Sequence, residues 1–289
     1  MFLKLGTVFA HEEPSETTKH FEDGSSFTFA CDRYVSERGV VAYRGRPALV
    51  VRTRCESAER HRAGTAVWLH GGPFTKFEEV PQAKQAALLS LGYELVTPLY
   101  LSSADRELDV RSDGEVASNM DDAIAEVVAV VKHAQQSGGR VILCGESYGA
   151  LLAAAARHLR ATDKLVLIGP ILKSIEQLTR SAPKLLAAPL TFTGSDPHNL
   201  SMDEQEALTR KVFERFYGAW FDRNIVSILS ARHPRDMLVI YGDKDEVIGL
   251  DLMPPLLALG GRSVVLHGSG HQAAPTRADI DRIIAELKR

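Results

Sequence analysis

The most constraining feature of this sequence is a regular alternation of short apolar segments with segments of helical periodicity. The apolar runs are typical of buried strands, and the segments between them have apolar residues spaced as on one face of a helix. The expected strands are residues 66–70, 93–100, 140–144, 165–168, 237–240 and 264–266. Because these strands are apolar throughout, the alternation predicts a mostly parallel sheet with helices on both faces.

Several helix boundaries can be placed from capping residues. Ser118 with Asp121, and Thr276 with Asp279, have the spacing of a capping box, so each pair predicts the start of a helix. The glycines at 138–139 predict the end of the first of these helices. The other expected helices are residues 81–91 and 150–159.

The predicted strands and helices divide the chain into a core and two additions. A β-hairpin around an Arg-Gly turn begins near residue 39, and we assign residues 39–170 and 237–289 to the α/β core. Residues 171–236 are too many for an ordinary connection, and we expect a mainly helical cap inserted over the sheet edge. A plain extra helical layer is the alternative. Residues 1–38 form an N-terminal extension without an assigned structure.

Composition excludes several classes of function. The chain has 289 residues, with 34 basic and 37 acidic side chains, and this near-balance argues against nucleic acid or an anionic membrane as a partner. Neither a secretory signal nor a membrane helix is apparent, which favours a soluble, cytoplasmic protein. The three scattered cysteines predict neither a zinc site nor a disulfide framework. We expect no metal or organic cofactor.

The strongest chemical signal is the G-x-S-x-G sequence of residues 145–149. It lies between an expected strand and an expected helix, which is the setting of a nucleophile on a sharp strand-to-helix turn. Gly145 and Gly149 suit this turn because a side chain at either position would clash across it. Ser147 is therefore the candidate nucleophile.

A second glycine-rich segment follows an earlier strand. His70, Gly71, Gly72 and Pro73 stand at the end of the strand expected over 66–70. Acyl transfer needs backbone N–H donors aimed at the oxyanion, and a pair of glycines lets the main chain approach closely. We expect Gly71 or Gly72 to donate together with the N–H of Tyr148, which follows the candidate nucleophile. His70 is interpreted as support for this loop.

An acid and a histidine follow the last strands. Asp243, Asp245 and Glu246 compete as the orienting acid, and we favour Asp245, with Asp243 as the alternative. His271 lies on a glycine-flanked loop, whereas His267 belongs to the end of the last strand. The chain order Ser, Asp, His favours His271 as the base.

With these motifs in place, the chain resembles the α/β-hydrolase superfamily, and within it the catalytic domain of the prolyl oligopeptidase family. The resemblance covers about residue 60 to the end, and its carriers are residues 70–73, 91–96, 114–116, 121–122, 147–149, Gly242 with Asp245, and His271. It implies that Ser147 attacks, that His271 transfers the proton and that Asp245 orients His271.

The chain departs from this family at several positions. Glu146 precedes the serine where the family usually has an aromatic residue or a glycine, and Ala150 replaces a second glycine. No β-propeller fits in the 60 residues before the domain. Proline-releasing aminopeptidases of the same superfamily have a further glycine where this chain has Phe74. Phe74 and Glu146 are the candidate substrate contacts, and the Glu146 carboxylate could bind a substrate amine.

The function expected from these features is acyl transfer through an acyl-enzyme intermediate. A peptidase or amidase acting on small peptides or aminoacyl amides is the first choice, because the predicted cap would restrict substrate size. A carboxylesterase or thioesterase is the alternative. A non-catalytic member of the superfamily that only binds a small molecule or short peptide is the rival from another class.

Overall fold

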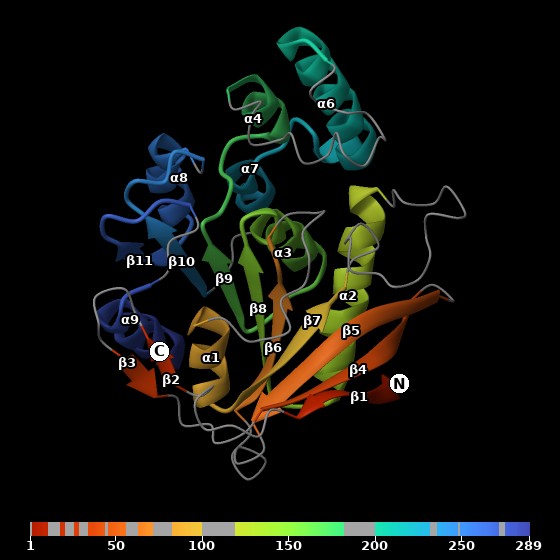
Figure 1. Cartoon of the computed structure of the whole chain (residues 1–289), viewed down its shortest axis with the longest axis vertical. Helices are drawn as coiled ribbons and strands as arrows, with labels where there is room; N and C mark the ends of the chain where they lie inside the picture. The colour runs from red at the N-terminus through yellow and green to blue at the C-terminus, as the bar shows by residue number, and fades with distance from the viewer. Residues whose placement is uncertain are drawn as a thin grey trace.

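The computed structural model of the chain is shown in Figure 1. It describes residues 2–10, 18–20, 26–28, 34–43, 46–55, 63–71, 83–99, 119–181, 200–231, 236–247, 249–271 and 275–289. No helix in these ranges is long and apolar enough to cross a membrane.

A nine-stranded sheet runs through the molecule in the order β1-β4-β5-β7-β6-β8-β9-β10-β11. Its strands are β1 (Phe2–Ala10), β4 (Tyr34–Tyr43), β5 (Arg46–Cys55), β6 (Gly64–Leu69), β7 (Tyr93–Pro98), β8 (Arg140–Glu146), β9 (Lys164–Ile168), β10 (Met237–Gly242) and β11 (Gly261–Leu266). In this order, each strand from β7 through β6, β8, β9 and β10 to β11 pairs in parallel with the next. The pairs β1–β4, β4–β5 and β5–β7 are antiparallel. A separate two-stranded ribbon joins β2 (Thr18–His20) and β3 (Ser26–Thr28). The predicted mostly parallel sheet and the hairpin of β4 and β5 are confirmed.

Helices cover both faces of the sheet, as the apolar strands require. On one face lie α2 (Met120–Gln136) and α3 (Tyr148–Leu159), which pack against Val67 and Leu69 of β6. On the other face lie α1 (Ala83–Ser90) and α9 (Arg277–Lys288), which pack with Trp68 from the same strand. Every residue of β6 is buried. A fully buried Leu or Val contributes about 1.5–3 kcal/mol, so this two-sided burial dominates the stability of the core.

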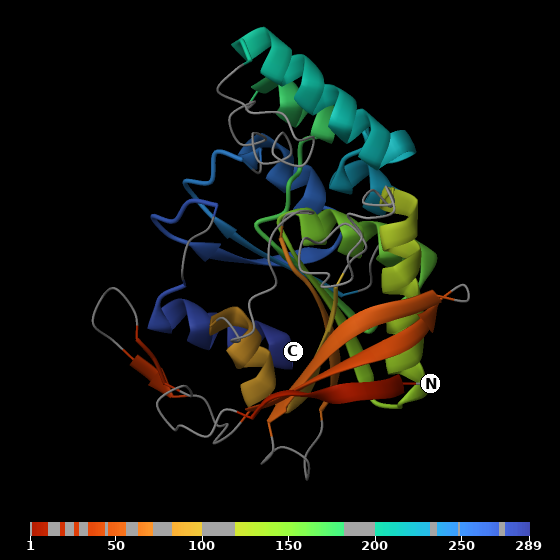
Figure 2. The same cartoon turned by 45° about the vertical axis from the view of Figure 1, so that its right-hand side comes forward.

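The segment between β9 and β10 is helical in its described part. It contains α4 (Ile175–Ser181), α6 (Met202–Tyr217), a short 3₁₀ helix η5 (Gly218–Trp220) and α7 (Ile225–Ser230). Figures 1 and 2 show these helices beyond the carboxyl ends of β8 and β9, with α6 the outermost. A capping box of Ser201 and Glu204 begins α6. The indole Nε1 of Trp220 donates to Asp121 Oδ1 over 2.7 Å and joins this layer to α2.

After β10 the chain forms a short 3₁₀ helix and a short α-helix before the last strand. These are η6 (Leu250–Leu252) and α8 (Met253–Leu257). The final helix α9 begins at the capping box of Thr276 and Asp279, as expected. The glycines at 138–139 follow α2, and both have positive φ, which confirms them as the end of that helix.

Three features differ from expectation or go beyond it. The N-cap of α2 is Asn119, whose side chain accepts from the N–H of Asp122, so α2 begins one residue later than the Ser118 box predicts; Ser118 lies outside the described residues. Strand β1 lies within the unassigned extension and pairs with β4. Cys55 is disulfide-bonded, which the scattered cysteines did not predict.

Candidate functional site

Ser147 occupies a strained turn between β8 and α3. Its backbone has φ 51° and ψ −112°, and among the described residues it is the one non-glycine with positive φ. A Cβ at Gly145 would lie 2.1 Å from the carbonyl oxygen of Gly149, and one at Gly149 would lie 2.2 Å from that of Leu69. Glycine at both positions therefore permits the turn, which presents the Ser147 hydroxyl at the carboxyl end of β8.

A continuous hydrogen-bond chain links Ser147, His271 and Asp245. The Ser147 Oγ lies 2.8 Å from His271 Nε2, and His271 Nδ1 lies 2.8 Å from Asp245 Oδ2. The Asp245 side chain is fully buried, whereas the His271 side chain is 19% exposed. The second carboxylate oxygen of Asp245 accepts from the backbone N–H of Val247 over 2.9 Å. Both Asp245 oxygens are thus held, and one of them faces the imidazole.

Two loops bring Asp245 and His271 together. Asp245 follows β10 and His271 follows β11, and the Lys244 N–H donates to the Ser269 carbonyl over 3.0 Å. A Cβ at Gly242 would lie 2.1 Å from the same carbonyl oxygen. The glycine that ends β10 therefore allows the two loops to approach closely enough for the imidazole and the carboxylate to meet.

Asp243, the alternative acid, has different partners. Its carboxylate lies 3.0 Å from His267 Nδ1 and accepts from the Gly268 N–H over 2.7 Å. Hydrogen bonds from His267 and then Gly268 lower the pKa of the Asp243 carboxyl below its ordinary value. The structure therefore joins Asp245, and not Asp243, to His271.

Part of the expected oxyanion site falls within the described residues. Gly71 lies two residues after the end of β6, and a Cβ placed there would lie 3.3 Å from the Ser147 Cβ. Tyr148 is the first residue of α3, where backbone N–H groups have no acceptor within the helix. Both backbone segments therefore lie beside Ser147. Gly72 and Phe74 lie outside the described residues.

His70 directly precedes Gly71 and contacts its backbone. Its Nδ1 lies 3.0 Å from the carbonyl oxygen of Gly71. Burial lowers the pKa of His70 below its ordinary value, so the neutral imidazole is favoured. This position agrees with the interpretation of His70 as loop support.

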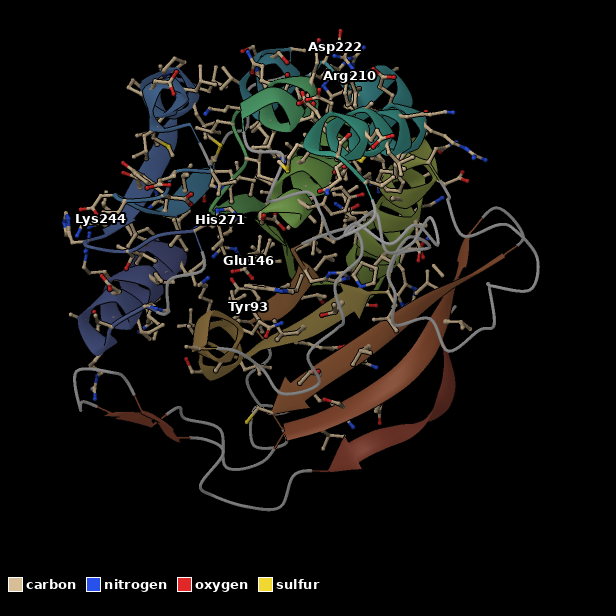
Figure 3. All side chains as sticks on the ribbon, turned by 45° about the horizontal axis from the view of Figure 1, so that its top comes forward. Tyr93, Glu146, Arg210, Asp222, Lys244 and His271 are labelled. Carbon is tan, nitrogen blue, oxygen red and sulfur yellow. The ribbon has the colours of Figure 1, made fainter. Side chains whose placement is uncertain are left out.

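Glu146 forms an ion pair that the sequence did not reveal. Its Oε1 accepts from Lys84 Nζ over 2.6 Å, and Lys84 belongs to α1. Figure 3 shows Glu146 and His271 at the same end of the sheet. Lys84 is the residue near the site that sequence reasoning missed. Nothing in the sequence pattern connects positions 62 residues apart.

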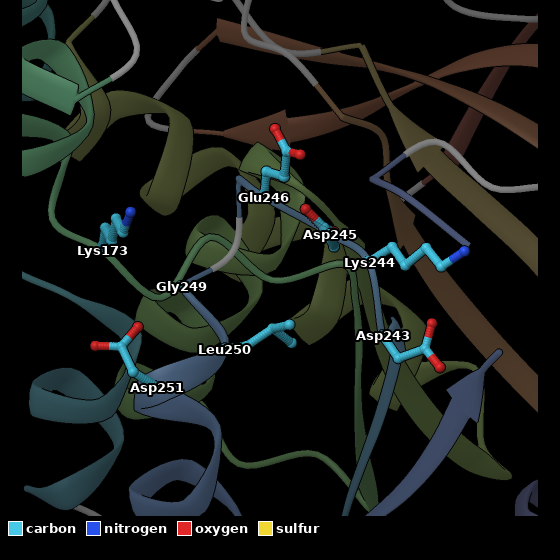
Figure 4. Close-up of a pocket in the computed structure, with 8 residues that line it drawn as sticks. All are labelled: Lys173, Asp243, Lys244, Asp245, Glu246, Gly249, Leu250 and Asp251. Carbon is cyan, nitrogen blue, oxygen red and sulfur yellow. The ribbon is translucent and has the colours of Figure 1, made fainter. Parts of the chain in front are cut away.

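A surface pocket of about 530 Å³ is lined in part by the loop that carries Asp245 (Figure 4). Its lining is mostly charged and consists of Lys173, Asp243, Lys244, Asp245, Glu246, Gly249, Leu250 and Asp251. In the described part of the chain, no group of three or more His, Cys, Asp or Glu side chains is placed to hold a metal ion.

Comparison with known families agrees with this architecture. Residues 66–286 match the alpha/beta hydrolase family, and the chain belongs to that family. No curated protein sequence matches the chain.

Solved structures with the same fold include peptidases and esterases. A puromycin-hydrolysing peptidase from Mycobacterium tuberculosis superimposes with a TM-score of 0.58 at 17% identity, covering 88% of this chain and 38% of the peptidase. This chain thus spans well under half of that protein. Est1E from Butyrivibrio proteoclasticus gives 0.57 at 14% identity, covering 87% of this chain and 99% of Est1E. A fungal esterase from Rhizomucor miehei gives 0.55 at 17% identity, covering 95% and 86%.

Proposed function

We propose that the protein is a serine hydrolase that transfers an acyl group to water through a covalent intermediate. The observation that supports this most strongly is the hydrogen-bond chain from Ser147 through His271 to Asp245, built on the strained turn at Ser147. A nucleophile, a base and an orienting acid in contact are the arrangement that activates a serine hydroxyl.

The proposed reaction has two steps. The Ser147 Oγ attacks the substrate carbonyl carbon while His271 Nε2 accepts the hydroxyl proton, and the carbonyl oxygen becomes an oxyanion that backbone N–H groups of Gly71 and Tyr148 stabilise. His271 then gives the proton to the leaving group, and an acyl-serine remains. Water then attacks the acyl carbon while His271 Nε2 takes a proton from it. The bond between the Ser147 Oγ and the acyl carbon breaks, His271 returns the proton to the Ser147 Oγ, and the acid leaves. Asp245 holds the imidazole tautomer throughout.

We propose a small peptide or aminoacyl amide as the substrate class, and esters are the second candidate. Helices α4, α6 and α7 favour small substrates, because they occupy the space beyond the carboxyl ends of the strands. Solved structures of the same fold include a peptidase and esterases, so the fold accommodates both amide and ester substrates. The Glu146 carboxylate is already paired with Lys84, so that pair would have to open for Glu146 to bind a substrate amine.

Turnover of an aminoacyl arylamide and of a short acyl ester by the purified protein separates the two classes. We expect kcat/KM to be higher for the arylamide, and Ser147→Ala to abolish hydrolysis of both substrates. A preference for the ester would reassign the protein as an esterase. Hydrolysis that persists in Ser147→Ala would show that another group is the nucleophile.

A further inference from the structure

The ion pair of Lys84 and Glu146 lies directly beside the candidate nucleophile. Glu146 is the last residue of β8 and precedes Ser147, and Lys84 reaches it from the first turn of α1. The two charged groups are 2.6 Å apart. The side chain of Lys84 is 8% exposed and that of Glu146 is 22% exposed, so water screens this pair only weakly.

Glu146 also lies close to the expected oxyanion site. A Cβ placed at Gly71 would be 3.3 Å from the Ser147 Cβ and 3.9 Å from the Glu146 Cγ. Both side chains therefore flank the backbone segment that is expected to face the oxyanion. The charge of Glu146 is also close enough to His70 to raise its pKa, although burial has the larger, opposite effect.

A carboxylate in this place opposes the reaction unless its charge is cancelled. The substrate oxygen becomes negative in the transition state, and a nearby negative charge raises the energy of that state in a site of low dielectric. We propose that Lys84 is an electrostatic positioning residue for the acyl-transfer site: it neutralises Glu146, so that the oxyanion forms without a net negative charge beside Ser147. This inference rests on the proposed serine hydrolase function.

An electrostatic role of the Lys84–Glu146 pair and a purely structural one predict different directions of change in the reaction rate when one partner is replaced. If the pair only holds α1 against β8, removal of either partner weakens the site in the same direction. If charge is what matters, removal of the Lys84 charge slows the reaction and removal of the Glu146 charge does not. Removal of both charges then reverses most of the loss caused by the first change.

The experiment measures the second-order rate at which a fluorophosphonate modifies Ser147. This reaction forms the Ser147 Oγ–P bond, releases fluoride and develops negative charge on a phosphonyl oxygen, so it tests the charge effect without an identified substrate. We expect Lys84→Met to slow modification on the order of tenfold. Glu146→Gln should react faster than the wild type, and Lys84→Met/Glu146→Gln should return to within about threefold of it.

Folding is monitored for every variant by circular dichroism, because an unpaired buried charge is destabilising. If Lys84→Met does not fold, the comparison of Glu146→Gln with the double variant carries the test, since these two differ only in the Lys84 charge and should differ about tenfold. Glu94→Gln is the matched control, because Glu94 pairs with Arg52 between β7 and β5, away from the site.

The outcomes of this experiment are distinct. A double variant as slow as Lys84→Met, or equal slowing by the two single changes, would overturn the proposal for Lys84. Wild-type protein that is folded but not modified at Ser147 would instead contradict the proposed function.

Discussion

Asp243 and Asp245 are two positions apart, yet their carboxylates face different histidines. The Asp243 Oδ2 lies 3.0 Å from His267 Nδ1, and the Asp245 Oδ2 lies 2.8 Å from His271 Nδ1. The first pair is exposed, while the Asp245 carboxylate is fully buried. Because only Asp245 contacts the histidine that reaches Ser147, the two acids have different roles.

Removal of each charge tests this difference. We expect Asp245→Asn to lower kcat/KM by about 10³–10⁴-fold, because the amide favours the wrong imidazole tautomer. Asp243→Asn should change it by less than about threefold, since an exposed pair contributes little. The measurement is the rate of Ser147 modification or of arylamide hydrolysis. Equal losses in the two variants would contradict the assignment of Asp245.

The close approach at Gly149 predicts a strong effect on stability. A Cβ there would lie 2.2 Å from the Leu69 carbonyl oxygen, so we expect Gly149→Ala to destabilise the fold by several kcal/mol. Gly270→Ala is the control, because a Cβ at Gly270 meets nothing within 4 Å. Urea unfolding measures both. A Gly149→Ala variant as stable as the control would show that the turn can relax.

These results show which parts of the site can be predicted from sequence. The turn at Ser147 was predictable because its glycines are required by local backbone geometry, and the positions of residues 242–245 and 271 follow from the order of the strands. The sequence favoured Asp245 over Asp243 as the partner of His271, and the structure agrees. Local backbone geometry did not decide between the two acids, because neighbouring carboxylates in a turn differ in where they point, and the partner of Asp243, His267, was not predicted.

Long-range polar contacts could not be predicted from the sequence pattern either. The Lys84–Glu146 pair and the Trp220–Asp121 hydrogen bond join residues far apart in the chain, and no periodicity marks them. The edge strand β1 was also missed. Its register with β4 shifts twice, so its apolar residues do not follow one regular alternation.

Lys164 is a buried lysine that joins β9 to the end of α9. Its Nζ donates to the carbonyl oxygens of Glu286 and Leu287 over 3.1 and 3.2 Å, and Asp236 lies 3.5 Å away. We expect Lys164→Met to lower the free energy of unfolding by about 2–4 kcal/mol, because the two carbonyls lose a charged donor. The exposed Lys211→Met is the control, with an expected change within about 0.5 kcal/mol.

The same lysine predicts a dependence of stability on pH. Burial lowers the pKa of Lys164 below its ordinary value of 10.5, and Asp236 only partly offsets this effect. Between the folded and the unfolded pKa, the unfolded chain binds more protons, so the free energy of unfolding gains a contribution that rises with pH. Unfolding curves at increasing alkaline pH should show this rise in the wild type relative to Lys164→Met. A constant difference between the two would contradict it.

Helix α6 contacts the residue that follows Ser147. The ring centroid of Tyr148 lies 6.2 Å from that of Phe216 and 6.0 Å from that of Tyr217, and all three residues are buried. We expect Phe216→Ala to cost about 3–5 kcal/mol and Phe216→Leu less than about 1.5 kcal/mol. If the contact also positions the Tyr148 N–H, the fluorophosphonate should modify Ser147 more slowly in folded Phe216→Ala than in Phe216→Leu. Equal rates of Ser147 modification in the two variants would show that the contact stabilises the fold but does not position the Tyr148 N–H.

The most direct test of the central claim is fluorophosphonate labelling of the purified protein followed by peptide mapping. The account predicts selective modification of Ser147, lost in Ser147→Ala and strongly reduced in His271→Ala, because the hydroxyl needs the imidazole to accept its proton. Both variants should remain folded. Modification of another residue, or none in a folded sample, would contradict the assignment of Ser147 as an activated nucleophile.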